Sequence, residues 1–210
     1  MEAVFVGITG ASGAIYGVRL VRALVAAEWR VHLAASDAAF RVFEAECGVR
    51  LDPRRPVLGE LLGPAAEGVL YHAIDAVEAP PSSGSYPLRG AVIAPCSLGT
   101  AARVAAGFSS NLIERVCDVA LKEGRPLILV PRETPLHRIH LDNLSRLAWA
   151  GATILPAMPG FYHRPRTVEE LVDHVVLKIL DRLGVPNDLV RRWGEEPGEE
   201  EEGASPRRPS

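Results

Sequence analysis

The sequence has little of what marks secreted, membrane-spanning or nucleic-acid-binding proteins. Its three cysteines, Cys47, Cys96 and Cys117, are scattered without the spacing of metal ligands, so we expect reduced thiols. No apolar stretch approaches the ~20 residues of a membrane span, and no signal peptide is visible, since Met1 leads directly into an apolar segment. A net charge of -3 gives no electrostatic reason to expect nucleic acid or a membrane surface as partner. These absences predict a cytoplasmic protein that binds neither nucleic acid nor membrane and holds no metal.

Lysine is also scarce. Lys122 and Lys178 are the only lysines among 23 basic residues. A codon preference for arginine explains the low number but not the two positions, which suggests that a compact charge is needed there. Two solvated surface lysines are the plain alternative.

What is present is the composition of one ordinary globular domain. With 210 residues, of which 48% are hydrophobic and 23% charged, the chain is long enough to bury a sizeable core. After Pro186 apolar residues become sparse, and Trp193 is the last that we expect to be anchored. Residues 194–210 carry a run of glutamates, which predicts a disordered acidic tail behind a single domain over residues 1–193.

Apolar runs and helical periodicity alternate along the chain. Short apolar segments bounded by turn residues predict buried strands, and apolar residues at helical spacing predict helices that pack on them. This alternation is typical of an α/β fold with a single doubly wound parallel sheet, a Rossmann-like or flavodoxin-like three-layer sandwich. The expected strands are 3–7, 30–35, 68–74, 90–95, 126–130 and 152–156, and the expected helices are 18–27, 38–47, 57–62, 97–106, 112–122, 135–150 and 168–183.

A glycine-rich turn follows the first expected strand. Its Gly-x-x-Gly-x-x-Gly pattern, from Gly7 to Gly13, lets the backbone approach a ligand and leads into a helix whose free N–H groups favour an anion. Ser12 is expected to cap this helix or to contact a phosphate. A tight turn without a ligand is the alternative. The second strand ends at Ser36, where a dinucleotide-binding fold would place an acid that binds the ribose, and this favours a mononucleotide over NAD. Asp37, one position later, could take the place of that acid and is the alternative.

Two more turns are expected at the same edge of the sheet. Ser97 and Thr100 follow the fourth strand, and Arg132 and Glu133 follow the fifth. Thr134 is expected to cap the next helix, with Pro135 in its first turn. Parallel strands bind ligands at their carboxyl ends, so these turns predict one crevice. Arg132 and Glu133 serve either the function of this crevice or a structural ion pair.

Five segments resemble one known family. Residues 9–17, Thr-Gly-Ala-Ser-Gly-Ala-Ile-Tyr-Gly, are similar to the opening of the UbiX-type flavin prenyltransferases. These belong to a wider group of flavoproteins that includes phosphopantothenoylcysteine and peptidyl-cysteine decarboxylases. Segments 94–100, 118–123, 130–135 and 159–163 follow in the family's order, so the resemblance spans about residues 3–193.

The resemblance implies a prenyl transfer to a flavin. Reduced FMN is the acceptor and dimethylallyl phosphate the donor, and the prenyl group becomes joined to N5 and C6. The product, prenylated FMN, is the cofactor of UbiD-type decarboxylases, which are the expected recipients. The family forms homo-oligomers, commonly dodecamers. The sequence has no aspartate-rich motif for a magnesium diphosphate, which suits a monophosphate held by side chains.

The resemblance also implies roles for individual residues. Ser12 and Glu133 match groups that manage protons, and Glu46 matches another acid near the site, although a solvated glutamate is the plain alternative. Asp37 stands where many relatives have lysine, so any phosphate-related role there is in doubt. The matches to phosphate-holding groups are Lys122, Arg132, Tyr162 and Lys178, and the matches to FMN contacts are Gly10, Ala11, Ser12, Ser36, Ser97, Leu98, Gly99, Thr100 and Arg132.

Two other functions are compatible with a flavin site. One is an FMN-dependent cysteine decarboxylase-like flavoprotein, but we find neither its characteristic asparagine-containing motif nor an equivalent of its histidine. The other is a non-catalytic flavin carrier that serves a decarboxylase partner. A carrier has no reason to hold the cationic and acidic residues that match the family.

Overall fold

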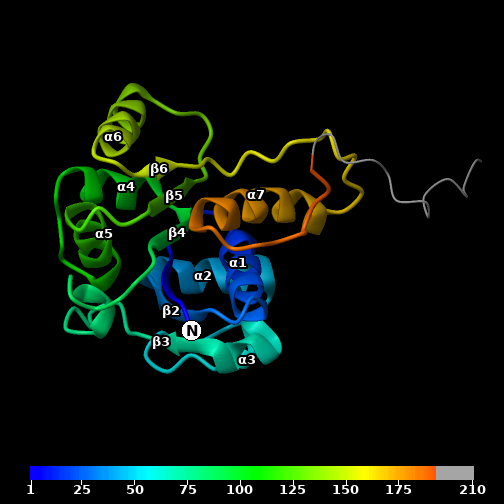
Figure 1. Ribbon diagram of the computed structural model, residues 1–210, viewed down its shortest axis with the longest axis horizontal. Coiled ribbons are helices and arrows are strands. Elements are labelled where there is room, and N and C mark those ends of the chain that lie inside the picture. Colours follow the sequence, from blue (N-terminus) through cyan, green and yellow to red (C-terminus); the bar gives the residue numbers. More distant parts are fainter. Residues whose placement is uncertain (193–210) are drawn as a thin grey trace, which may run out of the picture.

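The computed structural model describes residues 1–192 and has three layers, with one parallel sheet between two sets of helices (Figure 1). The strand order is β3-β2-β1-β4-β5-β6, so the order reverses between β1 and β4 as in Rossmann-type sheets. This confirms the predicted single doubly wound sheet. Trp193 and the predicted tail lie outside the described residues. The strands are β1 (Ala3–Ile8), β2 (Arg30–Ala35), β3 (Val69–Tyr71), β4 (Ala91–Cys96), β5 (Leu127–Pro131) and β6 (Thr153–Ile154).

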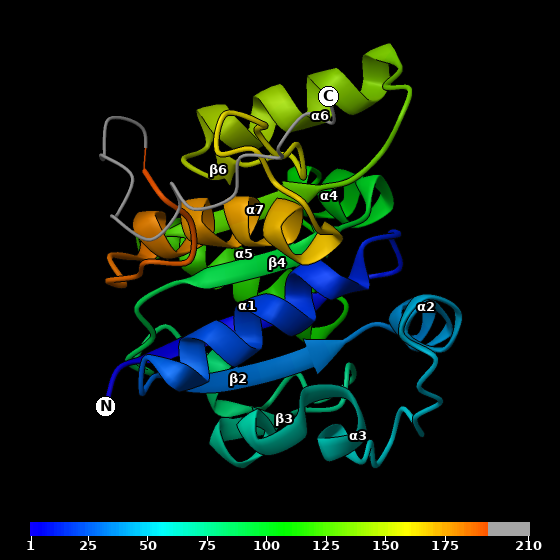
Figure 2. The same cartoon turned by 90° about the vertical axis from the view of Figure 1, so that its right-hand side faces the viewer.

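Helices cover both faces of the sheet. α1 and α7 lie side by side on one face, where α2 and α3 also pack (Figure 2). α4, α5 and α6 pack against the other face. Within residues 1–192, no helix is both long enough and apolar enough to cross a membrane. The helices are α1 (Ala14–Ala26), α2 (Asp37–Cys47), α3 (Leu58–Leu62), α4 (Leu98–Ala105), α5 (Leu112–Lys122), α6 (Arg138–Trp149) and α7 (Val168–Leu183), and the 3-10 helices are η1 (Gly63–Gly68) and η2 (Pro80–Ser82).

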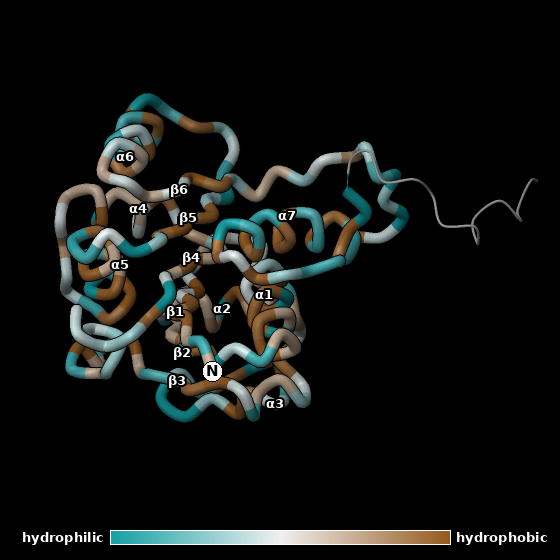
Figure 3. Tube along the Cα trace, in the orientation of Figure 1, coloured by the Kyte–Doolittle hydropathy of each residue, from teal (hydrophilic) through white to brown (hydrophobic). Residues whose placement is uncertain are grey.

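The core forms because the central strands are apolar along their whole length. Every residue of β4 is buried, and β1 and β5 are buried almost throughout, as expected for a sheet covered on both faces. Brown, hydrophobic segments accordingly gather at the centre in Figure 3. The edge strands β3 and β6 are shorter than predicted, and Val168, the first residue of α7, is exposed.

Two predicted helix caps are wrong. α1 begins at Ala14, and its N-cap is Gly13, whose φ of 103° lies in the left-handed region that glycine tolerates. Ser12 therefore lies one residue too early to cap it. α6 begins only at Arg138, where the His137 imidazole accepts the N–H of His140 at 3.3 Å, so Thr134 does not cap it.

Two histidines and a tyrosine form a buried chain of hydrogen bonds against β2. His32 Nδ1 lies 2.8 Å from His72 Nε2, and His32 Nε2 lies 3.0 Å from the Tyr86 hydroxyl. The His32 side chain is almost fully enclosed, with 1% of its surface exposed. Burial, together with nearby His72 and Arg30, lowers the pKa of His32 to about 4. Burial also lowers the pKa of His72.

The burial of His32 predicts that the free energy of unfolding decreases in acid. Relative to His32→Gln, which cannot titrate, we expect the free energy of unfolding of the unmodified protein to fall as the pH is lowered from 6.5 to about 4. In that range the unfolded chain protonates His32 while the folded chain does not, so protons favour unfolding. The full effect is at most about 3 kcal/mol, because one pKa unit corresponds to ~1.4 kcal/mol. Urea unfolding over a pH series measures the difference, and parallel curves for the two proteins would contradict it.

Candidate functional site

Thr9 joins the turns that follow β1 and β4. Its hydroxyl donates to the Pro95 carbonyl at 2.8 Å and accepts the Ser97 N–H at 2.7 Å. Its own N–H donates to the same carbonyl at 3.2 Å. The side chain is buried, so these bonds are shielded from water. The two turns are therefore one structural unit at the point where the strand order reverses, as the sequence predicted.

Glu46 occupies the N-terminus of α1. Its carboxylate accepts the N–H of Gly13 at 2.8 Å and that of Ala14 at 3.0 Å, although it reaches them from the far end of α2. Burial opposes ionisation, but hydrogen bonds from Ser12 and these two N–H groups, with the charge of Arg132, lower the pKa of Glu46. The N–H groups that the glycine pattern assigned to a phosphate are thus bonded to the protein's own carboxylate.

Arg132 links the end of β5 to the same turn. Its Nε donates to the Ser12 carbonyl at 2.9 Å. Glu133 turns elsewhere, and its exposed carboxylate accepts the N–H of Thr134 at 3.1 Å. The adjacent charges of Arg132 and Glu133 therefore do not pair within residues 1–192, which argues against the structural ion pair considered above.

Serines that follow β2 and β4 cap the neighbouring helices. Ser36 Oγ accepts the N–H of Ala39 at 3.3 Å and begins α2. Ser97 Oγ accepts the N–H of Thr100 at 3.2 Å and lies 3.0 Å from its hydroxyl, at the start of α4. Ser36, which the resemblance matches to a flavin contact, is therefore also the N-cap of α2.

Three of the predicted flavin contacts, Gly10, Ala11 and Leu98, are closely packed against the rest of the protein. A Cβ on Gly10 would lie 2.3 Å from the Ala38 Cβ, so only glycine allows this approach to α2. Ala11 and Leu98 are buried, and their side chains face the interior. We call the group that meets at this edge of the sheet the edge site: Gly10, Ala11, Ser12, Ser36, Glu46, Ser97, Leu98, Gly99, Thr100 and Arg132.

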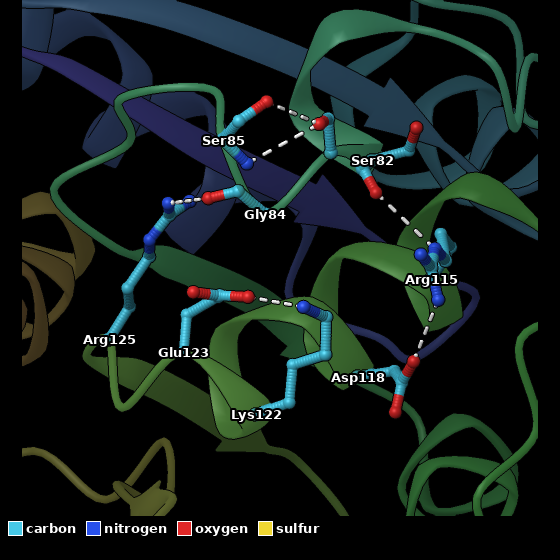
Figure 4. A network of polar contacts seen from close by, with 9 residues as sticks. Ser82, Gly84, Ser85, Arg115, Asp118, Lys122, Glu123 and Arg125 are labelled. Carbon is cyan, nitrogen blue, oxygen red and sulfur yellow. Dashed lines mark hydrogen bonds and ion pairs between the residues drawn. The ribbon is translucent and has the colours of Figure 1, made fainter.

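Lys122 lies away from the edge site. It ends α5, and the chain then enters β5 at Leu127, so it lies near the amino ends of the parallel strands. Its ammonium group pairs with Glu123, and both lie against Gly84 (Figure 4). Hydrogen bonding to Lys122 lowers the pKa of Glu123.

Two arginines that sequence analysis missed hold the turn over Lys122. Arg115 Nε donates to the Ser82 carbonyl at 3.3 Å, and Arg125 donates to the Gly84 carbonyl (Figure 4). Arg115 also pairs with Asp118 at 2.9 Å. A signal for Arg115 was present, because it precedes Lys122 by seven residues and so shares a face of α5 with it. The contact of Arg125 with a distant loop has no local signal.

Tyr162 and Lys178 form a third group. Tyr162 lies on a segment between β6 and α7 that extends from the body of the molecule (Figure 1). Its ring lies 5.6 Å from the ring of His174 on α7. Lys178 is exposed one helical turn beyond His174. One chain therefore brings Ser12, Glu46 and Arg132 together but leaves Lys122 near the opposite ends of the strands.

The described part of the chain contains no group of three or more potential metal ligands. The edge site instead provides helix N-termini, hydroxyls and a guanidinium group, which suit a phosphorylated ligand. An ionised carboxylate beside a serine can also orient or accept a proton there. This chemistry fits a mononucleotide-binding enzyme.

Comparisons with known proteins agree with this arrangement. The sequence profile of the flavoprotein family matches residues 1–180. The chain is 51% identical to the flavin prenyltransferase UbiX of Halalkalibacterium halodurans, over 91% of this chain and 93% of that protein. It is similar to the crystal structure of AnUbiX in complex with FMN and dimethylallyl pyrophosphate, with a TM-score of 0.83 and 35% identity over 93% of this chain and 99% of the other. A dodecameric FMN-dependent UbiX-like decarboxylase from Escherichia coli O157:H7 gives a TM-score of 0.82 at 38% identity, over 92% of this chain and 100% of the other.

These matches extend along nearly the whole chain. They include the segments that carry the edge site as well as those that carry Lys122 and Tyr162. The family profile and the 51% identity together identify the protein as a member of the flavoprotein family, and within it of the UbiX-type flavin prenyltransferases.

Proposed function

We propose that the protein transfers the dimethylallyl group of dimethylallyl phosphate to N5 and C6 of reduced FMN. The observation that carries this proposal is the 51% identity to a flavin prenyltransferase over nearly the full length of both chains. The edge site adds physical support, because it combines an anion-binding helix start with an ionised carboxylate and a guanidinium group. The expected product is prenylated FMN.

The edge site fits FMN as the prenyl acceptor. A Cβ on Gly99 would meet nothing within 4 Å, so there is open space at the start of α4 for a ligand. Ser97 and Thr100 bring hydroxyls to this space, and the dipole of α4 favours a phosphate. The bound flavin supplies the nucleophilic N5 and C6. The protein's residues hold it and exclude water from the allylic cation.

Glu133 is our candidate for proton transfer. Its carboxylate is exposed and bonded only to a neighbouring N–H among the contacts of the described chain, so it is free to turn toward a ligand. Glu46 is committed to two N–H groups and to Ser12, which suits orientation of the Ser12 hydroxyl. We therefore assign proton transfer to Glu133 and Ser12, and positioning of Ser12 to Glu46.

The donor phosphate is best held where subunits meet. In one chain Lys122 lies near the amino ends of the strands, away from Arg132, and a neighbouring copy can supply it to the edge site. Large apolar side chains on α6 support an interface, since Ile139 and Trp149 are 66% and 90% exposed. The dodecameric relative supports the same arrangement. We infer a homo-oligomer, a dodecamer by analogy, with shared sites.

The biological setting follows from the product. A UbiD-type decarboxylase is the proposed recipient of prenylated FMN, and the transfer takes place in the cytoplasm. The catalytic domain spans residues 1–193, with 194–210 as an appended tail.

Product analysis tests the activity. Protein mixed anaerobically with reduced FMN and dimethylallyl phosphate is expected to yield a flavin heavier by one prenyl group, with a changed absorption spectrum. A parallel reaction with dimethylallyl pyrophosphate, which AnUbiX binds, determines the preferred donor. A flavin carrier returns unmodified FMN, and a cysteine decarboxylase instead releases carbon dioxide from a cysteine-terminated peptide. Either result would contradict the proposed transfer.

The role of Glu133 predicts a kinetic defect without a binding defect. Glu133→Gln keeps the shape and removes the charge, so we expect unchanged FMN affinity and product formation slowed by about 10²–10⁴-fold. Flavin titration and single-turnover kinetics measure the two quantities. Glu78→Gln, at another exposed glutamate, is the matched control and should behave as the unmodified protein. If Glu133→Gln turns over at the rate of the unmodified protein, Glu133 is not the proton-transfer group, and Ser12 or the released phosphate must take that role.

Shared sites predict complementation between defective subunits. Ser12→Leu and Lys122→Ala should each abolish activity, but a dissociated and reassembled equal mixture should regain about a quarter of it, because one site in four receives both intact halves. Ser12→Leu mixed with Arg132→Ala should regain nothing, since both lesions lie in the edge site of one chain. No recovery in the first mixture would place the whole site within a single chain.

A further inference from the structure

The turn over residues 82–85 is packed directly on Lys122. A Cβ added to Gly84 would lie 2.9 Å from Lys122 Nζ and 2.4 Å from Glu123 Oε1. The turn therefore restricts the ammonium group on the side of Gly84, while the rest of the lysine side chain is half-exposed. Figure 4 shows the Lys122–Glu123 pair beneath Gly84.

Tyr86 follows this turn in the sequence and is bonded to it through its backbone. Its N–H donates to the Ser83 carbonyl at 3.2 Å. Ser85 N–H donates to Ser83 Oγ at 3.3 Å, and the two serine hydroxyls lie 2.9 Å apart. These bonds are local and partly exposed to water, so they fix the shape of the turn more firmly than its place on the molecule.

Arg115 and Arg125 hold the turn to α5 and to the segment before β5, and the Tyr86 hydroxyl joins it to β2. This hydroxyl lies 3.0 Å from Nε2 of buried His32, and the two rings meet edge to face with centroids 5.2 Å apart. His32 is fixed by its strand, since β2 pairs with both β1 and β3, and by its second hydrogen bond to His72. A neutral imidazole donates through one nitrogen and accepts through the other, so both contacts are satisfied at once.

We propose that Tyr86 is a positioning residue of the transferase, whose hydroxyl bond to His32 holds the turn over residues 82–85 against Lys122. It thereby keeps the Lys122 ammonium group where it binds the phosphate of the prenyl donor. This inference rests on the proposed function, in which Lys122 holds that phosphate. It adds a residue that touches neither substrate and acts through the turn alone.

Tyr86→Phe tests the inference, with Tyr71→Phe as the matched control. Both variants keep the ring and lose one hydroxyl bond, but Tyr71 donates to the Pro53 carbonyl at 2.7 Å, away from the turn. In the ligand-free protein, we expect Tyr86→Phe to speed amide hydrogen exchange at Ser83, Ser85 and Tyr86 itself by about tenfold, the value of one hydrogen bond. We expect KM for dimethylallyl phosphate to rise by about five- to tenfold with kcat little changed.

Several results would overturn the inference. They are unchanged exchange in Tyr86→Phe, equal acceleration of the same amides in Tyr71→Phe, and faster exchange without a change in KM. A merely structural loss would lower kcat and the amount of folded protein, leaving KM unaltered. If the unmodified protein makes no prenylated FMN, the proposed function fails, while the exchange measurement still decides whether Tyr86 holds the turn.

Discussion

The arrangement of the edge site depends on a buried hydroxyl. Thr9 bridges the ends of β1 and β4, the two strands between which the sheet changes direction. The Thr9 hydroxyl adds two shielded hydrogen bonds to the backbone contact and the strand pairing that already join the turns after these strands. With these bonds, the starts of α1 and α4 keep one relative position, and a ligand that contacts both meets a rigid surface.

The N-termini of α1 and α4 differ in the group that satisfies their N–H donors. The start of α1 is satisfied by Glu46, so its dipole stabilises a carboxylate of the protein. The start of α4 is capped only by the hydroxyl of Ser97 and retains its attraction for an external anion. One end therefore holds a fixed negative charge beside Ser12, and the other keeps backbone N–H groups that favour an anion.

The sequence predicted the sheet, most of the helices and the edge site, because these follow from local periodicity and from the rule that parallel strands end at one edge. It failed where a distant group replaces a local one. Ser12 was the obvious cap of α1, but Glu46 reaches that helix from 32 residues away and Gly13 takes the cap position. The hydrogen bond from Arg125 to the Gly84 carbonyl and that between His32 and Tyr86 likewise form only in the folded chain. The residues between the partners give no local signal for either bond.

The burial of Ala11 and Leu98 limits which side chains these two positions can hold. Both belong to segments that resemble the flavin-binding signature, yet only 7% and 5% of their surfaces are exposed. The size of the side chain at each position is therefore limited by the packing around it. Substitution of Ala11 or Leu98 would therefore first disturb the packing beneath the edge site, before it altered the choice of ligand.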